Sequence, residues 1–164
     1  MVGLTEEEAH LMLHGNSKYF HSVLVSRIME VLSRRFNVET REWALVGLTH
    51  DLDHDLIAGD MTRHGRVSAQ MLEGKLSPSA LRAIRSHDHR SGLKPQSLLE
   101  RALIFADSLA VLIEDQKVKT PVTPGIFFDA LRNECSDRPW IGDTILGFAE
   151  REGIAIQEVI NELQ

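Results

Sequence analysis

Residues 43–55, WALVGLTHDLDHD, join an apolar run to a dense cluster of ionisable side chains. The run from Trp43 to Leu48 lacks the apolar and polar alternation of a half-buried strand and is typical of a buried helix. Positions 50–55, which follow, hold three aspartates and two histidines. A buried helix that ends in this way predicts a polar site at its carboxyl end.

The rest of the chain also has helical periodicity. Apolar residues recur mostly three and four positions apart, and convincing period-two runs of β-branched residues are absent, so we expect an all-α domain. Four helix starts are marked by capping-box pairs or by a capping residue before proline: Thr5 with Glu8, Ser97 with Glu100, Ser77-Pro78 and Thr123-Pro124. These signals predict helices near residues 5–14, 17–37, 40–52, 62–75, 78–89, 96–114, 124–135, 139–152 and 155–163.

Length and composition are those of one ordinary globular domain, which we expect to span residues 1–164. No stretch approaches the roughly 18 apolar residues of a membrane span. The acidic start of the chain and the single cysteine, Cys135, suit the cytoplasm. A net charge of −6 has the wrong sign for binding long nucleic acid, although a small anionic ligand held by metal ions is compatible with it.

Several ionisable residues are expected to face inward. His21 shares a helix face with apolar residues three, four, seven and eleven positions further on, although one inward histidine is more often an ordinary core residue. Asp107 is flanked at helical spacing by apolar residues on both sides. Because an uncompensated buried carboxylate costs at least several kcal/mol, Asp107 needs a partner, either a buried arginine or a metal ion.

Three further histidines follow the same pattern. His50 ends the apolar run together with Asp51, and His64 and His87 each share a side with apolar residues of their own predicted helices. Core packing does not require four inward histidines and two inward aspartates in one small domain, so together they predict a metal site. The mixture of imidazole and carboxylate, without a cysteine cluster, favours a catalytic site with a first-row divalent ion over a structural zinc.

In this order, His21, the pair His50-Asp51 and Asp107 resemble the H…HD…D signature of the HD superfamily, the metal-dependent phosphohydrolases. The flanking stretches FHSVLV, LTHDL and IFADSL are similar to the corresponding helices of that family. The similarity covers about residues 17–114 and leaves C-terminal helices over 124–163. It implies a single-domain helical bundle of the HD-domain type.

Some members of the family hold two metals and have two further histidines where this chain has His64 and His87. The resemblance therefore implies two divalent ions, of Mn, Fe, Co, Ni, Mg or Zn. One ion would be held by His21, His50 and Asp107, and the other by His64 and His87. Asp51 would bridge the two ions and take part in catalysis, and it is the sixth predicted metal ligand.

The loop after the HD pair departs from the family pattern, because Asp53-His54-Asp55 replaces the usual glycine-containing turn. We expect Asp53 and Asp55 to cap or solvate this turn. His54 is a candidate catalytic residue that protonates the leaving group or binds a phosphate, although a solvated loop histidine fits it equally well. Among nearby cations, the leading candidate phosphate ligands are Lys18, Arg63 and Arg66. Arg85, Arg90 and Lys94 are further candidates, although each of the six is more often simply a solvated surface charge.

The leading hypothesis is hydrolysis of a phosphoester by metal-activated water, with a nucleotide or another small phosphorylated metabolite as the substrate. Two alternatives remain open. Certain HD proteins resemble this ligand set and are di-iron oxygenases, and a chain of this fold can also serve as a non-catalytic nucleotide-binding module. Oxygen consumption, or ligand binding without turnover, would distinguish them.

Overall fold

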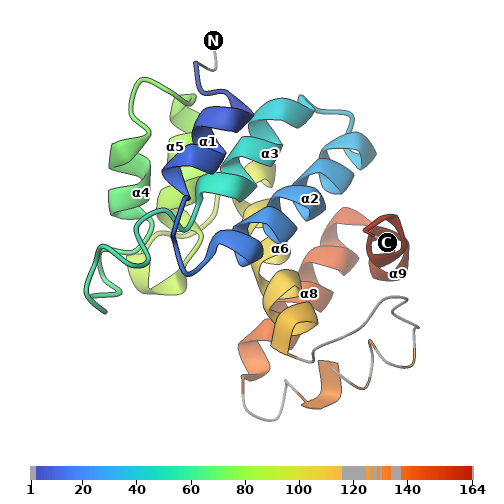
Figure 1. Cartoon of the computed structure of the whole chain (residues 1–164). Coiled ribbons are helices and arrows are strands. Elements are labelled where there is room, and N and C mark those ends of the chain that lie inside the picture. The colour runs from blue at the N-terminus through green and yellow to red at the C-terminus, as the bar shows by residue number, and fades with distance from the viewer. Residues whose placement is uncertain are drawn as a thin grey trace.

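The computed structural model describes residues 3–115, 125, 127, 129, 131–133 and 138–163, and the described residues form helices joined by turns (Figure 1). The all-α prediction is confirmed, and the chain is a single-domain helical bundle. The named elements are α1 (Glu6–Met12), α2 (Tyr19–Arg35), α3 (Thr40–Thr49), α4 (Arg66–Met71), α5 (Pro78–Ser86), the short 3₁₀ helix η1 (His89–Ser91), α6 (Leu98–Asp115), α8 (Pro139–Glu152) and α9 (Ile156–Glu162).

Three of the four predicted helix starts are confirmed by hydrogen bonds. Thr5 and Glu8 form a reciprocal capping box, and Ser77 accepts a bond from the backbone N–H of Ala80. Ser97 and Glu100 exchange bonds at the start of α6 in the same way as the first pair. The fourth start, Thr123-Pro124, lies outside the described residues, as do Cys135 and much of the helix predicted over 124–135.

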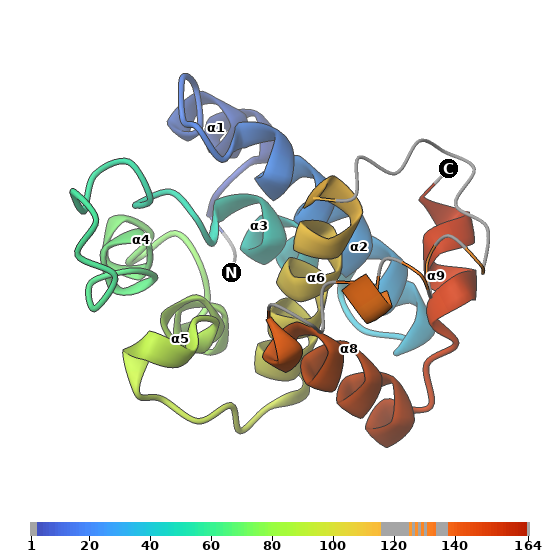
Figure 2. The ribbon, with the colours of Figure 1, turned by 90° about the horizontal axis from the view of Figure 1, so that it is seen from below.

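Helices α2, α3 and α6 form the centre of the bundle (Figure 2). The helices α2 and α3 approach closely where Gly47 meets Ser26, and a Cβ atom at Gly47 would lie only 2.8 Å from the Cα of Ser26. A larger residue at Gly47 would therefore push the two helices apart. This close contact fixes the carboxyl end of α3 beside the first turns of α2.

The helix predicted over 62–75 is shorter than expected. Helix α4 begins only at Arg66, because Gly65 has a φ of 74° in the left-handed region, and it ends before Gly74, whose φ is also positive at 75°. Residues 62–65 therefore form turns, and His64 lies just before the helix.

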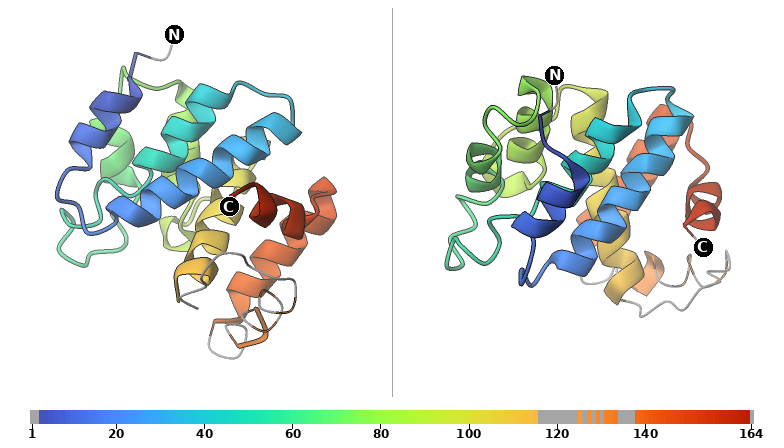
Figure 3. Two further views of the ribbon diagram at one scale, coloured as in Figure 1. Left: turned by 45° about the vertical axis from the view of Figure 1, so that its right-hand side comes forward. Right: turned by 45° about the horizontal axis from the view of Figure 1, so that its top comes forward.

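The C-terminal helices pack against α6 and α2 (Figure 3). Phe148 of α8 stacks on Phe105 of α6, with ring centroids 4.6 Å apart. Arg35 at the end of α2 forms ion pairs with Glu158 and Glu162 of α9 at 2.8 and 2.5 Å. Among the helices described, none combines the length and the apolar character needed to cross a membrane.

Candidate metal centre

The six residues predicted as metal ligands come together in the interior of the bundle, although they belong to five different parts of the chain. Each occupies a helix or a position beside a helix end: His21 is in the first turn of α2, His50 caps α3 and precedes Asp51, His64 lies just before α4, His87 caps α5, and Asp107 is in the middle of α6. All are buried except Asp107, whose side chain is 28% exposed.

One group is formed by His21, His50 and Asp107, whose potential ligand atoms all lie within 4.8 Å of one another. The Nε2 atom of His21 is 2.8 Å from Oδ1 of Asp107, and the Nε2 atom of His50 is 3.7 Å from the same oxygen. The start of α2, the end of α3 and the middle of α6 thus direct two imidazoles and one carboxylate to a common point.

A second group surrounds the Asp51 carboxylate. Its Oδ1 atom lies 3.1 Å from Nε2 of His64 and 3.5 Å from Nε2 of His87, and these two nitrogens are 3.1 Å apart. Oδ1 is also 3.4 Å from Nε2 of His50, while Oδ2 is 3.8 Å from Nε2 of His21. Asp51 therefore lies between the two groups, and its role as a bridge between two ions stays a prediction.

All four histidines direct Nε2 into this cluster and Nδ1 away from it. His50 and His87 have Nδ1 2.7 Å from the carbonyl oxygens of Gly47 and Ile84, respectively. Because a carbonyl only accepts hydrogen bonds, Nδ1 must carry the hydrogen in both rings. Their Nε2 atoms can then present lone pairs to a cation.

At His21 and His64 a carboxylate, of Glu114 and Asp53 respectively, takes the place of the backbone carbonyl that faces Nδ1. Oε2 of Glu114 lies 2.7 Å from Nδ1 of His21, and Oδ1 of Asp53 lies 2.8 Å from Nδ1 of His64. A carboxylate in this position fixes the ring and makes it a stronger metal ligand.

The chemistry of this cluster fits a cation. His50 Nε2 is buried and has no hydrogen-bond partner among the described residues, yet it faces the two carboxylates of Asp51 and Asp107. A lone pair directed at anions is unfavourable unless positive charge lies between them. A metal ion would remove this conflict.

The distances fit as well. Metal bonds of about 2.0–2.2 Å place neighbouring ligand atoms roughly 2.8–3.6 Å apart in octahedral or tetrahedral geometry. The separations around Asp51 Oδ1, from 3.1 to 3.5 Å, fall in this range, as does the 2.8 Å between His21 and Asp107, while the 3.7 Å between His50 and Asp107 is slightly longer. The residues present therefore suit divalent ions after small movements of their side chains.

Protons supply the missing positive charge when no metal is bound. Burial lowers the pKa of His21, but Asp107, Glu114 and Asp51 outweigh it and raise the pKa to about 10. Burial is likewise outweighed at His64, where Asp51 and Asp53 raise the pKa to about 10. Burial raises the pKa of Asp51, and the neighbouring histidines reverse this and hold it well below its usual value. The cluster thus attracts cations of either kind.

Two residues of this arrangement were not predicted to take part in it. Glu114 lies seven positions after Asp107, two turns along the same face of α6, and that spacing could have identified it. Asp53 was expected to cap or solvate the turn, but it is fully buried and accepts hydrogen bonds from His64 and from the backbone N–H of Ser68. Asp55 is exposed and accepts bonds from the backbone N–H and hydroxyl of Ser17, in the turn before α2, rather than from the backbone of the turn that follows the HD pair.

Gly65 allows α4 and α5 to meet beside this cluster. A Cβ atom at Gly65 would lie 2.5 Å from the carbonyl oxygen of Ile84 and 3.2 Å from Nδ1 of His87. The same carbonyl accepts the hydrogen bond that orients His87. Only glycine therefore combines the left-handed backbone with this close approach.

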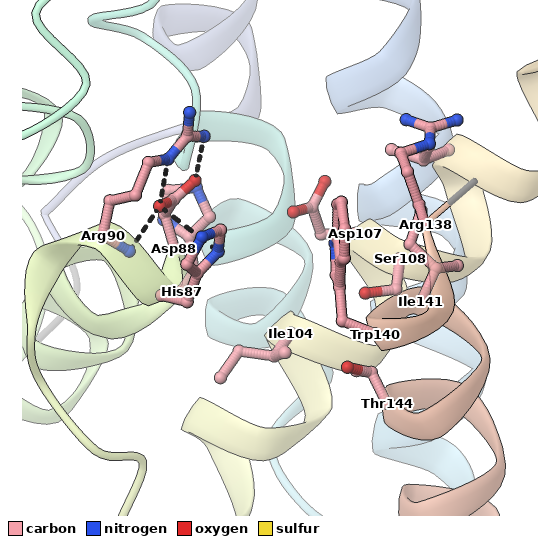
Figure 4. A pocket seen from close by; sticks show the side chains of 12 residues that line it. His87, Asp88, Arg90, Ile104, Asp107, Ser108, Arg138, Trp140, Ile141 and Thr144 are labelled. Atoms are coloured by element: carbon pink, nitrogen blue, oxygen red, sulfur yellow. Dashed lines mark hydrogen bonds and ion pairs between the residues drawn. The ribbon is translucent and has the colours of Figure 1, made fainter. Parts of the chain in front are cut away.

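A pocket of about 590 Å³ opens beside the cluster, between α5, η1, α6 and α8 (Figure 4). His87 and Asp107 line it, so it reaches two of the predicted ligands. Figure 4 shows the Asp107 carboxylate directed toward the side of the pocket on which His87 lies. The other lining residues include two arginines, Arg90 and Arg138, and the indole of Trp140. A small anionic molecule can therefore reach the cluster through this pocket.

His54, Lys18, Arg63 and Arg66 do not line this pocket. Arg66 donates a hydrogen bond to the carbonyl of Ser91. His54 has a side chain that is 34% exposed, and its ring centroid lies 6.1 Å from that of His64. The phosphate-binding role of the three cations and the catalytic role of His54 stay predictions.

Comparison with known proteins shows the family to which the chain belongs. The model of the HD domain family matches residues 19–112, which include all six predicted ligands, and the chain belongs to this family. A crystal structure from Clostridium acetobutylicum, described as a predicted HD superfamily hydrolase involved in NAD metabolism, has a similar fold. Its TM-score is 0.56 at 20% sequence identity, and the match covers 98% of this chain and 97% of that chain. No curated protein sequence matches the chain.

Proposed function

We propose that this protein is a metal-dependent phosphohydrolase that acts on a nucleotide or another small phosphorylated metabolite. The observation that carries the proposal is the convergence of four imidazole Nε2 atoms on the carboxylates of Asp51 and Asp107, with His50 Nε2 left without a hydrogen-bond partner among the described residues. Membership of the HD family supports it. So does the hydrolase description of the structural neighbour, although at 20% identity that likeness concerns the fold.

In this proposal His21, His50 and Asp107 would hold one ion, His64 and His87 would hold a second, and Asp51 would contribute to both. Two divalent ions would lower the pKa of water from about 15.7 towards 7 and would stabilise both the attacking and the leaving oxygens of a phosphoester. Glu114 keeps His21 oriented by accepting the hydrogen on its Nδ1, and Asp53 does the same for His64.

The pocket beside the ions is where the substrate would bind. Two arginines, Arg90 and Arg138, line it, and Arg90 is paired with Asp88 through bonds of 2.8 and 2.6 Å. This pair holds Arg90 in place at the pocket wall. His54 does not line this pocket, but it is partly exposed and its ring centroid lies 6.1 Å from that of His64, so it is our candidate for delivering a proton to a leaving oxygen on that side of the centre.

A screen of phosphate release tests the proposal. Protein stripped of metal and reloaded with Mn²⁺, Fe²⁺, Co²⁺, Ni²⁺, Mg²⁺ or Zn²⁺ is offered nucleotides, sugar phosphates and other phosphorylated metabolites. We expect metal-dependent release of phosphate, lost in Asp51→Asn and retained in Asp55→Asn, which changes an exposed carboxylate of the same loop. If no phosphoester is cleaved with any ion, the proposal is wrong, and oxygen uptake by the iron-loaded protein would favour the oxygenase.

A further inference from the structure

Helix α8 lies outside the segment that matches the HD family, yet it forms one wall of the pocket. Its inner face is anchored, because Ile141 and Ile145 are buried and Phe148 stacks on Phe105. The helix therefore presents a fixed surface to the pocket rather than a loose flap.

Trp140 stands on this surface next to the buried Ile141. Its side chain is 52% exposed, whereas the other tryptophan of the chain, Trp43, is only 6% exposed. Single exposed apolar residues are common and need no explanation by themselves. Trp140, however, lines the same pocket as Asp107 and His87, and its exposed indole is therefore available to a molecule bound beside the metal centre.

The surroundings of the indole suit a flat ring. The His89 ring lies 6.4 Å from Trp140, centroid to centroid, and its side chain is 75% exposed. The aliphatic side chains of Ile104, Val111 and Ile141 also line the pocket. One part of the pocket is thus aromatic and aliphatic, while another part holds the ligands Asp107 and His87.

We propose that Trp140 stacks on the base of a nucleotide whose phosphate faces the metal centre, and that it selects nucleotides over phosphates without a planar ring. The inference rests on the proposed function, because it takes the pocket to be the substrate site. A flat base satisfies the indole and the aliphatic wall at once, and stacking on an aromatic side chain tolerates any of the four bases.

Binding without turnover separates this inference from the proposed function. The probes are phosphonate isosteres of the four ribonucleoside 5′-phosphates, in which a methylene group replaces the ester oxygen, and the matching isostere of ribose 5-phosphate, which lacks only the base. Each is titrated into Mn²⁺-loaded protein, with tryptophan fluorescence and calorimetry as readouts. We expect nucleotide isosteres to quench the fluorescence of the wild-type protein.

Two substitutions of Trp140 sharpen the test. Trp140→Phe leaves the buried Trp43 as the sole indole, so the quench should vanish while affinity stays within a few-fold. Trp140→Ala should weaken binding of at least one nucleotide isostere about 5- to 150-fold, the range that a lost base stack typically costs, with binding of the ribose isostere unchanged. Leu146→Ala, a substitution at another exposed position of α8, is the matched control and should change neither affinity.

The inference is overturned if none of the four nucleotide isosteres quenches the fluorescence, or if Trp140→Ala weakens nucleotide and ribose isosteres equally. The two proposals can fail separately. Base-dependent binding through Trp140 without phosphate release from any nucleotide would support the inference and count against the hydrolase. Phosphate release from nucleotides that is unchanged in Trp140→Ala would support the hydrolase and count against the inference.

Discussion

Asp53→Asn tests whether the outer hydrogen bond of His64 decides its ability to bind metal. The buried carboxylate accepts two bonds, one on Oδ1 from Nδ1 of His64 at 2.8 Å and one on Oδ2 from the backbone N–H of Ser68 at 2.9 Å. Asparagine keeps the shape but offers one acceptor and one NH₂ donor. Because the Ser68 N–H can only donate, the amide oxygen must face Ser68 and the NH₂ must face His64.

The imidazole then has to accept at Nδ1, and its hydrogen moves to Nε2. That nitrogen faces Asp51 at 3.1 Å and is the atom proposed to bind the second ion. Loss of an outer partner of a ligating histidine typically costs about 10- to 100-fold in metal affinity. We expect at least this loss for the second ion and little change for the first, because Asp53 forms no hydrogen bond with His21, His50 or Asp107.

Calorimetric titration with Mn²⁺, together with elemental analysis after dialysis, gives the affinity and the number of ions. Asp55→Asn is the control, since it makes the same change at an exposed carboxylate that contacts Ser17 rather than a histidine ligand. Helical circular dichroism confirms that each variant is folded. Retention of both ions by Asp53→Asn at wild-type affinity would refute the argument about the tautomer of His64.

Three further predictions concern the same centre. Asp107→Asn should lower metal content and activity together, and unchanged values of both would mean an ordinary ion-pair role. Gly65→Ala should lower the free energy of unfolding by more than the roughly 1–2 kcal/mol that an alanine in the left-handed conformation costs, because its Cβ would also meet a carbonyl of α5. In denaturant titrations the control Gly74→Ala, which has open space around it, should show the backbone cost alone. Equal losses of stability in the two variants would count against the clash. Because their pKa values are raised, protonated His21 and His64 stabilise the metal-free fold. This stabilisation is complete at a pH below 6.5, the ordinary pKa of histidine, and is lost as the pH rises towards about 10. Metal binding should therefore release protons at pH 7, measurable as buffer-dependent heats, and a metal affinity independent of pH between 6 and 9 would contradict this.

Most of the helices followed from the sequence, and the six residues that it singled out lie close together in the structure. Helical periodicity placed His21 and Asp107 on buried faces, and capping patterns located the starts of α1, α5 and α6. These features depend on neighbours within a few residues, which a single sequence displays directly.

Features that depend on tertiary contacts were harder to predict. Asp53 lies in an irregular turn, where no periodicity indicates which way a side chain points, and its burial follows from the position of Ser68 on α4. Trp140 becomes part of the pocket only because α8 packs on α6. The sequence pattern does not specify that packing, since residues 116–138 separate the two helices along the chain.

The number of ions bound by the wild-type protein tests the central claim most directly. Protein purified gently, loaded with Mn²⁺ or Fe²⁺ and analysed for metal should contain about two ions per chain, in keeping with a two-metal hydrolytic site. His64→Ala and His87→Ala should each retain about one ion and lose activity, while His50→Ala should disturb both. Wild-type protein that saturates at one ion, with both outer variants keeping that ion and full turnover, would contradict the two-metal account, and failure to bind any ion would contradict the metal centre itself.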